Sequence, residues 1–129
     1  MTVKAEILIV DDDPRARAAM GEICRAAGYS VEMAVDGQAG LQAAMSGRYL
    51  LVLLDIHMPG LDGIAVARAI RALPAAAGQV PIVAVTADLF RETRERCRAA
   101  GINDQVAKPI VPGELLERIA AHMDLVSTA

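Results

Sequence analysis

Five polar side chains stand at the ends of short aliphatic runs, where together they could bind a metal ion and a phosphoryl group. They are Asp11, Asp12, Asp55, Thr86 and Lys108. Three carboxylates about 5 Å apart would repel one another by about 3 kcal/mol per pair at an effective dielectric constant of roughly 20, and one lysine offsets only part of this. A divalent cation is therefore expected. Oxygen ligands suit Mg²⁺, or Mn²⁺ in its place, and a hydroxyl and an ammonium group would complete a site for phosphoryl transfer.

These side chains can meet only if the runs before them are neighbouring strands of one sheet. Residues 7–10, 50–54 and 82–85 are almost entirely aliphatic, which is typical of parallel strands buried on both faces. Residues 30–34 and 104–107 predict two shorter strands. In open parallel sheets ligands bind beyond the carboxyl ends of the strands, so we expect the five side chains to converge there.

Ala-rich segments of helical length alternate with these strands. Asp13 and Pro14 have the types preferred at the cap and first position of a helix, and Gly28, Gly47 and Gly101 are expected to end helices. The expected helices span residues 14–27, 37–46, 63–72, 89–100 and 112–123, with residues 74–81 as a loop. Right-handed crossovers place such helices on both faces, so the fold class is α/β with a doubly wound five-stranded parallel sheet.

Length and composition favour one folded domain. The 129 residues are 54% hydrophobic with 2% aromatics, which argues against disorder. We expect residues 1–129 to form a single domain with a core of about residues 5–123 and a short tail, 124–129, that frays. A net charge of −3 gives no reason to expect nucleic-acid binding, so we expect protein partners.

The expected location is the cytoplasm. The apolar run near the start is too short for a signal peptide, and no stretch approaches the length of about 20 apolar residues that a membrane-spanning helix needs. Cys24 and Cys97 fall in separate expected helices, so we predict two buried thiols in a reducing compartment.

Four segments resemble the signature segments of bacterial response-regulator receiver domains, in the same order and with similar spacing. They are Val10-Asp11-Asp12-Asp13-Pro14, Leu54-Asp55-Ile56-His57-Met58-Pro59 followed by Asp62-Gly63, Val85-Thr86-Ala87, and Lys108-Pro109. The resemblance covers essentially the whole chain, and residues 81–87 are similar to receivers of hybrid sensor kinases. It implies a flavodoxin-like (CheY-like) fold with strand order 2-1-3-4-5.

The resemblance also implies a role in a two-component phosphorelay. Asp55 would accept a phosphoryl group from the phosphohistidine of a histidine kinase or histidine phosphotransfer protein, and the domain would act on a downstream protein target. Asp12, Asp55 and the backbone carbonyl of His57 would bind Mg²⁺, with Asp11 acting largely through a water. The chain would then be a signalling domain with self-catalysed phosphotransfer and slow autodephosphorylation, rather than an enzyme in its own right.

Thr86 and Lys108 are implied to contact the phosphoryl oxygens, and the bond between Lys108 and Pro109 is implied to be cis. Receivers usually carry Tyr or Phe three residues before this lysine, where this sequence has Gln105. The usual coupling between the threonine and an aromatic ring is therefore in doubt. The simple interpretation is that Gln105 is an exposed residue of an edge strand. Otherwise either the output face responds through backbone movement alone, or the domain mainly passes phosphate onward.

Other positions have simpler interpretations. Asp13 and Asp62 are expected to cap helices, and His122 is expected to be a solvated residue near the end of the last helix. His57 and Asp88, two residues after Asp55 and Thr86, are expected to pair and to flank the path of a hydrolytic water.

Two alternative functions stay open. One is a receiver-like module that binds partners without chemistry, although the intact five-residue set argues against it. The other is a haloacid-dehalogenase-type hydrolase, which needs an acidic residue two positions after its nucleophile, where this sequence has His57.

Overall fold

Five parallel strands form the sheet, and the computed structural model describes residues 6–127, without the side chains of residues 124–127. The strands are β1 Ile7–Val10, β2 Val31–Ala34, β3 Leu51–Asp55, β4 Ile82–Thr86 and β5 Asp104–Ala107. Their order in the sheet is β2-β1-β3-β4-β5, and every neighbouring pair is parallel. The expected strands and their implied order are confirmed.

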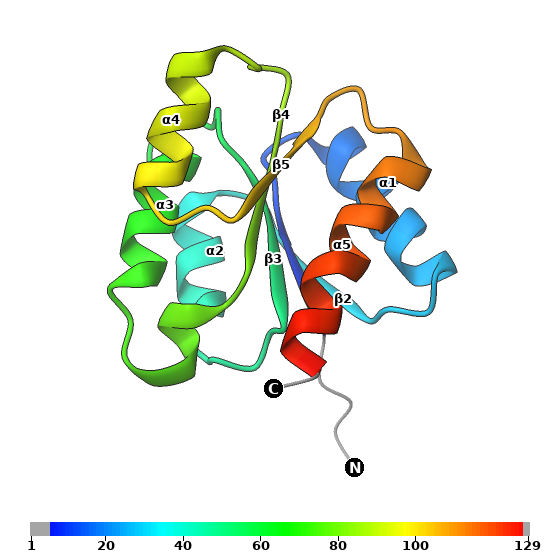
Figure 1. Ribbon diagram of the computed structural model, residues 1–129, viewed down its shortest axis with the longest axis horizontal. Helices are drawn as coiled ribbons and strands as arrows, with labels where there is room; N and C mark the ends of the chain where they lie inside the picture. Colours follow the sequence, from blue (N-terminus) through cyan, green and yellow to red (C-terminus); the bar gives the residue numbers. More distant parts are fainter. Residues whose placement is uncertain (1–5, 128–129) are drawn as a thin grey trace.

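The helices cover both faces of the sheet (Figure 1). They are α1 Pro14–Ala26, α2 Gly37–Ala44, α3 Gly63–Arg71, α4 Arg91–Ala99 and α5 Pro112–Ser127, with a short 3-10 helix, η1 Ala75–Gln79, before β4. Helices α1 and α5 pack on one face, and α2, α3 and α4 pack on the other. None of the helices within residues 6–127 is long and apolar enough to cross a lipid bilayer.

Strand side chains alternate between the two cores. Leu8 and Val10 of β1 belong to the cluster beneath α2, α3 and α4, whereas Ile7 and Ile9 belong to the cluster beneath α1 and α5. All four are fully buried, which explains why the run contains no polar residue. The first polar side chain therefore comes where the strand ends, at Asp11.

Aspartate side chains start three of the helices and fix the loops that follow the strands. Each accepts a hydrogen bond from a backbone N–H in the first turn of its helix, and the three are Asp13, Asp36 and Asp62. The expected caps at Asp13 and Asp62 are confirmed. Gly28 and Gly101, with φ of 97° and 91°, lie just beyond the ends of α1 and α4 as expected.

Four elements differ from the expectation, and the first is α2, which ends at Ala44 rather than at residue 46. Helix α4 begins at Arg91 rather than 89, because the carboxylate of Asp88 accepts the backbone N–H of Phe90 and holds residues 88–90 in a turn. The expected loop 74–81 contains η1. Helix α5 continues to Ser127, so the tail expected to fray from residue 124 is helical through 127, and residues 128–129 lie outside the described residues.

His122 is not the solvated residue that was expected. Its side chain is 16% exposed, and Nε2 lies 3.0 Å from Oδ2 of Asp104. Arg118 approaches the same carboxylate at 3.4 Å. The contact joins α5 to the start of β5, and sequence position alone did not indicate it.

The two cysteines are as predicted, because Cys24 and Cys97 are both free and buried.

Arg71, at the end of α3, ties together the loops at the amino ends of β4 and β5. Its five N–H donors make hydrogen bonds of 2.7–3.0 Å to the carbonyl oxygens of Gly78, Val80 and Gly101 and to Oδ1 of Asn103. The guanidinium group is partly desolvated, and burial lowers its pKa. A single side chain thus satisfies polar groups from η1, the turn before β4 and the turn before β5.

We expect Arg71→Met to lower the free energy of unfolding by about 2–4 kcal/mol, because it leaves several carbonyl oxygens without a donor. Urea unfolding followed by circular dichroism measures the change. Arg68→Met, on the exposed side of the same helix, is the matched control and should cost far less. Equal losses for the two variants would show that the Arg71 contacts contribute nothing specific.

Candidate functional site

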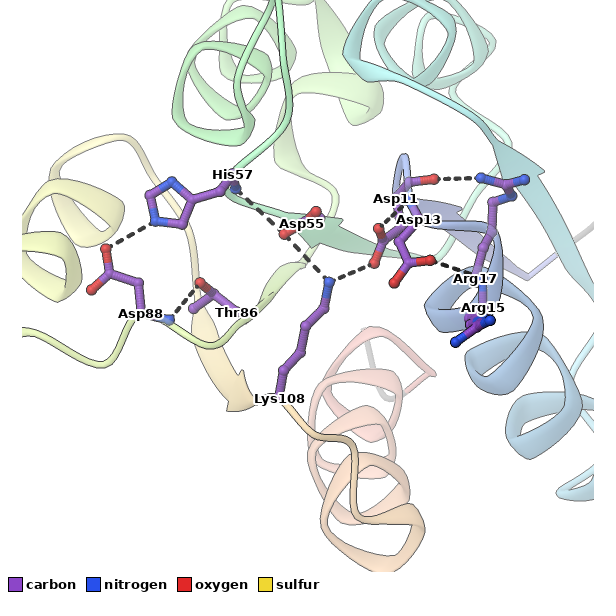
Figure 2. Close-up of polar contacts among 9 residues, drawn as sticks. All are labelled: Asp11, Asp13, Arg15, Arg17, Asp55, His57, Thr86, Asp88 and Lys108. Atoms are coloured by element: carbon purple, nitrogen blue, oxygen red, sulfur yellow. Dashed lines mark hydrogen bonds and ion pairs between the residues drawn. The ribbon is translucent and has the colours of Figure 1, made fainter.

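The carboxyl ends of four strands bring the five sequence-predicted side chains to one place, and Figure 2 shows all of them except Asp12. Asp11 follows β1, Asp55 ends β3, Thr86 ends β4 and Lys108 follows β5. Because β1 lies beside β3 and β3 beside β4, residues distant in sequence meet at this edge. The predicted convergence is confirmed for these four, and Asp12 joins them through the acidic cluster.

The acidic cluster consists of Asp11, Asp12 and Asp55. One carboxylate oxygen from each lies within 4.8 Å of the others. The side chain of Asp11 is fully buried and that of Asp55 is 7% exposed, so two of the three charges have lost most of their water. Such an all-oxygen set, with an excess of negative charge, fits a hard divalent cation such as Mg²⁺ or Mn²⁺.

Lys108 provides the positive charge of the site. Its Nζ lies 2.9 Å from Oδ2 of Asp11 and 3.6 Å from Oδ1 of Asp55. Burial acts to lower the pKa of Lys108, but the hydrogen bond from the ammonium group to Asp11 and the charges of both carboxylates raise that pKa overall. The ammonium group is therefore charged at neutral pH. The bond between Lys108 and Pro109 is cis, as expected.

The surroundings of Asp55 disfavour the charged form of its carboxyl group. Burial raises the pKa of Asp55 to about 6, and the charge of Asp11 adds to the effect, while Lys108 and the backbone N–H of His57 act in the opposite direction. At neutral pH the group is ionised but poorly solvated. A carboxylate in this state gains from binding a cation or an electrophilic phosphorus atom.

Three positioning contacts for the acidic cluster were not predicted. The guanidinium of Arg17, from α1, donates a 2.8 Å hydrogen bond to the backbone carbonyl of Asp11, and the backbone N–H of Asp13 donates to the Asp11 carboxylate at 2.9 Å. Gly63 packs directly against the backbone of Asp55, where a Cβ atom would collide with the carbonyl oxygen. Only the conformational freedom of glycine was visible in sequence, whereas this close approach depends on the fold.

Thr86 is buried, and its hydroxyl is oriented by a neighbour. Oγ1 accepts a 3.0 Å hydrogen bond from the backbone N–H of Asp88. A hydroxyl group has one hydrogen to donate in addition to accepting. Thr86 can therefore still donate to an anionic oxygen bound next to Asp55.

His57 and Asp88 pair across the mouth of the site, as expected. Nε2 of His57 lies 2.9 Å from Oδ2 of Asp88, and the hydroxyl of Thr93 donates to the same oxygen at 2.7 Å. The hydrogen bond from Thr93 and then the contact with His57 lower the pKa of Asp88. The histidine ring is 63% exposed, so the pair forms the outer wall of the site.

Gln105 is only partly exposed, and its amide is not free in solvent. Nε2 lies 3.3 Å from Sγ of Cys97, which joins β5 to α4. Beside it is a hollow of about 420 Å³ whose lining includes Leu89, Arg94 and Ile102. The simple expectation of an exposed edge-strand residue is therefore wrong. Its effect on signalling stays a prediction.

Sequence comparison gives a single consistent family. Residues 7–120 match the family described as "Response regulator receiver domain". Among curated relatives, the transcriptional regulatory protein PrrA of Mycobacterium tuberculosis is 36% identical over 115 residues, which cover 89% of this chain and 48% of that protein. The transcriptional regulatory protein HprR of Escherichia coli is 33% identical over 118 residues, covering 92% and 51%. The chain thus spans about half the length of these relatives.

Solved structures agree. The receiver domain of sensor histidine kinase PA1611 from Pseudomonas aeruginosa, with a magnesium ion coordinated in its active-site cleft, is 35% identical with a TM-score of 0.86, and the match covers 95% of this chain and 99% of that one. Chemotaxis protein CheY4 of Vibrio cholerae is 28% identical with a TM-score of 0.85, and the match covers 92% and 98%.

The raised pKa of Asp55 predicts that Asp55→Asn stabilises the metal-free protein. The folded state holds the Asp55 proton up to about pH 6, whereas the unfolded chain loses it near its ordinary value of 3.8. The destabilisation that ionised Asp55 causes is therefore absent below about pH 4 and complete above about pH 6. Above pH 6 the free energy of unfolding of the variant should exceed that of wild type by at most about 3 kcal/mol.

Urea unfolding from pH 4 to 8 with a chelator present measures the difference between Asp55→Asn and wild type. Added Mg²⁺ should narrow it, because only wild type keeps the full ligand set. A difference that is constant with pH would contradict the electrostatic origin of the effect.

Proposed function

Because the chain belongs to the response regulator receiver domain family, we propose that it is the phosphoryl-accepting domain of a two-component phosphorelay. Asp55 takes the phosphoryl group from a phosphohistidine. The observation that supports this most strongly is the buried Asp55 carboxylate, which lies close to a second buried carboxylate, Asp11, with the Lys108 ammonium group in contact with both. In an aspartate with a purely structural role we expect hydrogen-bond and ion-pair partners that lower the pKa, whereas the pKa of Asp55 is raised.

The proposed reaction forms one bond and breaks one. A carboxylate oxygen of Asp55 attacks phosphorus, the bond from phosphorus to the donor histidine nitrogen breaks, and the imidazole leaves with the electron pair. Lys108 neutralises charge on a phosphoryl oxygen, and the free hydrogen of the Thr86 hydroxyl is donated to another. These two groups contribute mainly electrostatic stabilisation, since neither exchanges a covalent bond.

A divalent ion at the acidic cluster would supply the remaining positive charge. We propose that Asp12, Asp55 and the backbone carbonyl of His57 hold Mg²⁺, or Mn²⁺ in its place, and that Asp11 contributes largely through a water. The spacing of the three carboxylates supports this assignment. The solved receiver of PA1611 contains magnesium in its cleft, which is the same class of ion.

The proposed partners are a histidine kinase or histidine phosphotransfer protein as donor, and a protein target for output, in the cytoplasm. We propose that residues 1–129 act as one receiver domain with slow autodephosphorylation, within either a stand-alone regulator or a hybrid kinase. The absence of nucleic-acid binding stays a prediction for these residues, since the curated relatives are transcriptional regulators of about twice the matched length.

We propose modulatory roles for three further residues. His57 and Asp88 restrict the approach of water to phosphorylated Asp55, which their pairing at 2.9 Å supports. Gln105, whose amide donates a hydrogen bond to Sγ of Cys97, occupies the position of the aromatic residue of most receivers. Its role is to favour onward transfer of phosphate over a large conformational change of the output face.

Incubation with Mg²⁺ and acetyl phosphate, followed by intact-mass measurement, tests the proposed function. Wild type should gain one phosphate, and Asp55→Asn should gain none while keeping its far-ultraviolet circular dichroism spectrum. A binding-only module would gain none in either form. A hydrolase would turn over the donor continuously without a lasting adduct.

Asp12→Ala should weaken Mg²⁺ binding by about tenfold or more, because it removes one charged oxygen ligand from a set of three. Titration of the metal-free protein by isothermal calorimetry measures the affinity. Asp13→Asn, which keeps a side-chain oxygen for the helix cap, is the neighbouring control and should change affinity little. Unchanged affinity in Asp12→Ala would remove Asp12 from the metal site.

A further inference from the structure

One hydroxyl of α4 holds the outer wall of the site in place. Thr93 lies in the first turn of α4, and its residue is 8% exposed. Oγ1 donates a 2.7 Å hydrogen bond to Oδ2 of Asp88, the oxygen that also faces Nε2 of His57 at 2.9 Å. Oδ1 of Asp88 accepts the backbone N–H of Phe90 at 3.1 Å. Asp88 is thus fixed from α4 and presented to His57.

Packing alone does not require a hydroxyl at this position. A buried threonine in a helix can return its hydroxyl to a carbonyl of the preceding turn, but here the hydroxyl donates to a carboxylate outside the helix. Valine would fill nearly the same volume, yet it would leave Asp88 with one fewer donor. The hydroxyl of Thr93 therefore positions Asp88 more than it stabilises α4.

Asp88 also connects to the reacting groups by its backbone. Its N–H donates to Oγ1 of Thr86 at 3.0 Å, and the backbone N–H of His57 lies 3.4 Å from Oδ1 of Asp55. Two of the four partners of Asp88, Thr86 and His57, therefore lie next to the phosphoryl position. The path from α4 to Asp55 consists of three polar contacts and does not involve Gln105.

We propose that Thr93 is a positioning residue that sets the lifetime of phosphorylated Asp55. By fixing Asp88, Thr93 keeps the His57 ring across the path of water to Asp55. The position of α4 against Asp88 therefore sets the rate of dephosphorylation. This rests on the proposed function of Asp55. In that hydrolysis a water oxygen bonds to phosphorus, the bond between phosphorus and the Asp55 oxygen breaks, and inorganic phosphate and a proton are released. A partner that lifts the first turn of α4 shortens the lifetime.

The test uses four variants loaded with phosphate from acetyl phosphate and Mg²⁺. They are Thr93→Val, Thr93→Ser, His57→Ala and the double variant Thr93→Val/His57→Ala. After removal of the donor, intact mass follows the decay of the phosphorylated form. Thermal melts check folding, and calorimetry checks that the two Thr93 single variants keep wild-type Mg²⁺ affinity.

Thr93→Val should decay about three to ten times faster than wild type, which corresponds to about 0.7–1.4 kcal/mol of barrier. Thr93→Ser, which keeps the hydroxyl, should decay at nearly the wild-type rate. The double variant should decay no faster than His57→Ala, since Thr93 acts through the same pair. Should Thr93→Val not fold, Thr93→Ala removes the same hydroxyl.

The outcomes separate two failures. If wild type takes no phosphate, the proposed function is wrong. If wild type is phosphorylated but Thr93→Val decays at the wild-type rate, or if the two single effects multiply in the double variant, the positioning role is wrong and Thr93 only stabilises the helix.

Discussion

The structure depends on one electrostatic conflict, the burial of two carboxylates beside each other at the edge of a hydrophobic sheet. Asp11 and Asp55 lie where β1 and β3 end, and among the residues that the structure describes only Lys108 forms ion pairs with both. Burial and the neighbouring carboxylate keep the Asp55 pKa raised, to about 6, despite that lysine. A folded state that tolerates this cost has a site suited to a divalent cation and an electrophilic phosphorus atom, which is the chemistry of the receiver family.

Much of this could be predicted from sequence because it follows from local pattern. Continuous aliphatic runs predict buried parallel strands, Asp13 and Asp62 predict caps, and the polar residues at strand ends predict a shared edge. The five-residue set, the strand order and the cis bond before Pro109 are all as expected. The strand order and the cis bond came from resemblance, since spacing alone does not determine either.

What sequence could not supply are the specific side-chain contacts between helices, strands and the loops that join them. Arg17 and Arg71 look like ordinary surface arginines of amphipathic helices, yet one binds a backbone carbonyl of the site and the other joins three loops. His122 pairs with Asp104 because α5 packs beside β5, and Thr93 pairs with Asp88 because the turn before α4 directs that carboxylate back to the first turn of the helix. Such partners depend on side-chain direction and distance, which hydrophobic periodicity does not encode.

The central claim is that Asp55 itself forms the acyl phosphate. Borohydride reduction of the protein after treatment with acetyl phosphate and Mg²⁺ converts a phosphorylated aspartate to homoserine, and peptide mass spectrometry locates the altered residue. The account predicts homoserine at Asp55 and an unaltered Asp11 and Asp12. Homoserine at another carboxylate with Asp55 intact, or phosphate that resists reduction, would contradict it.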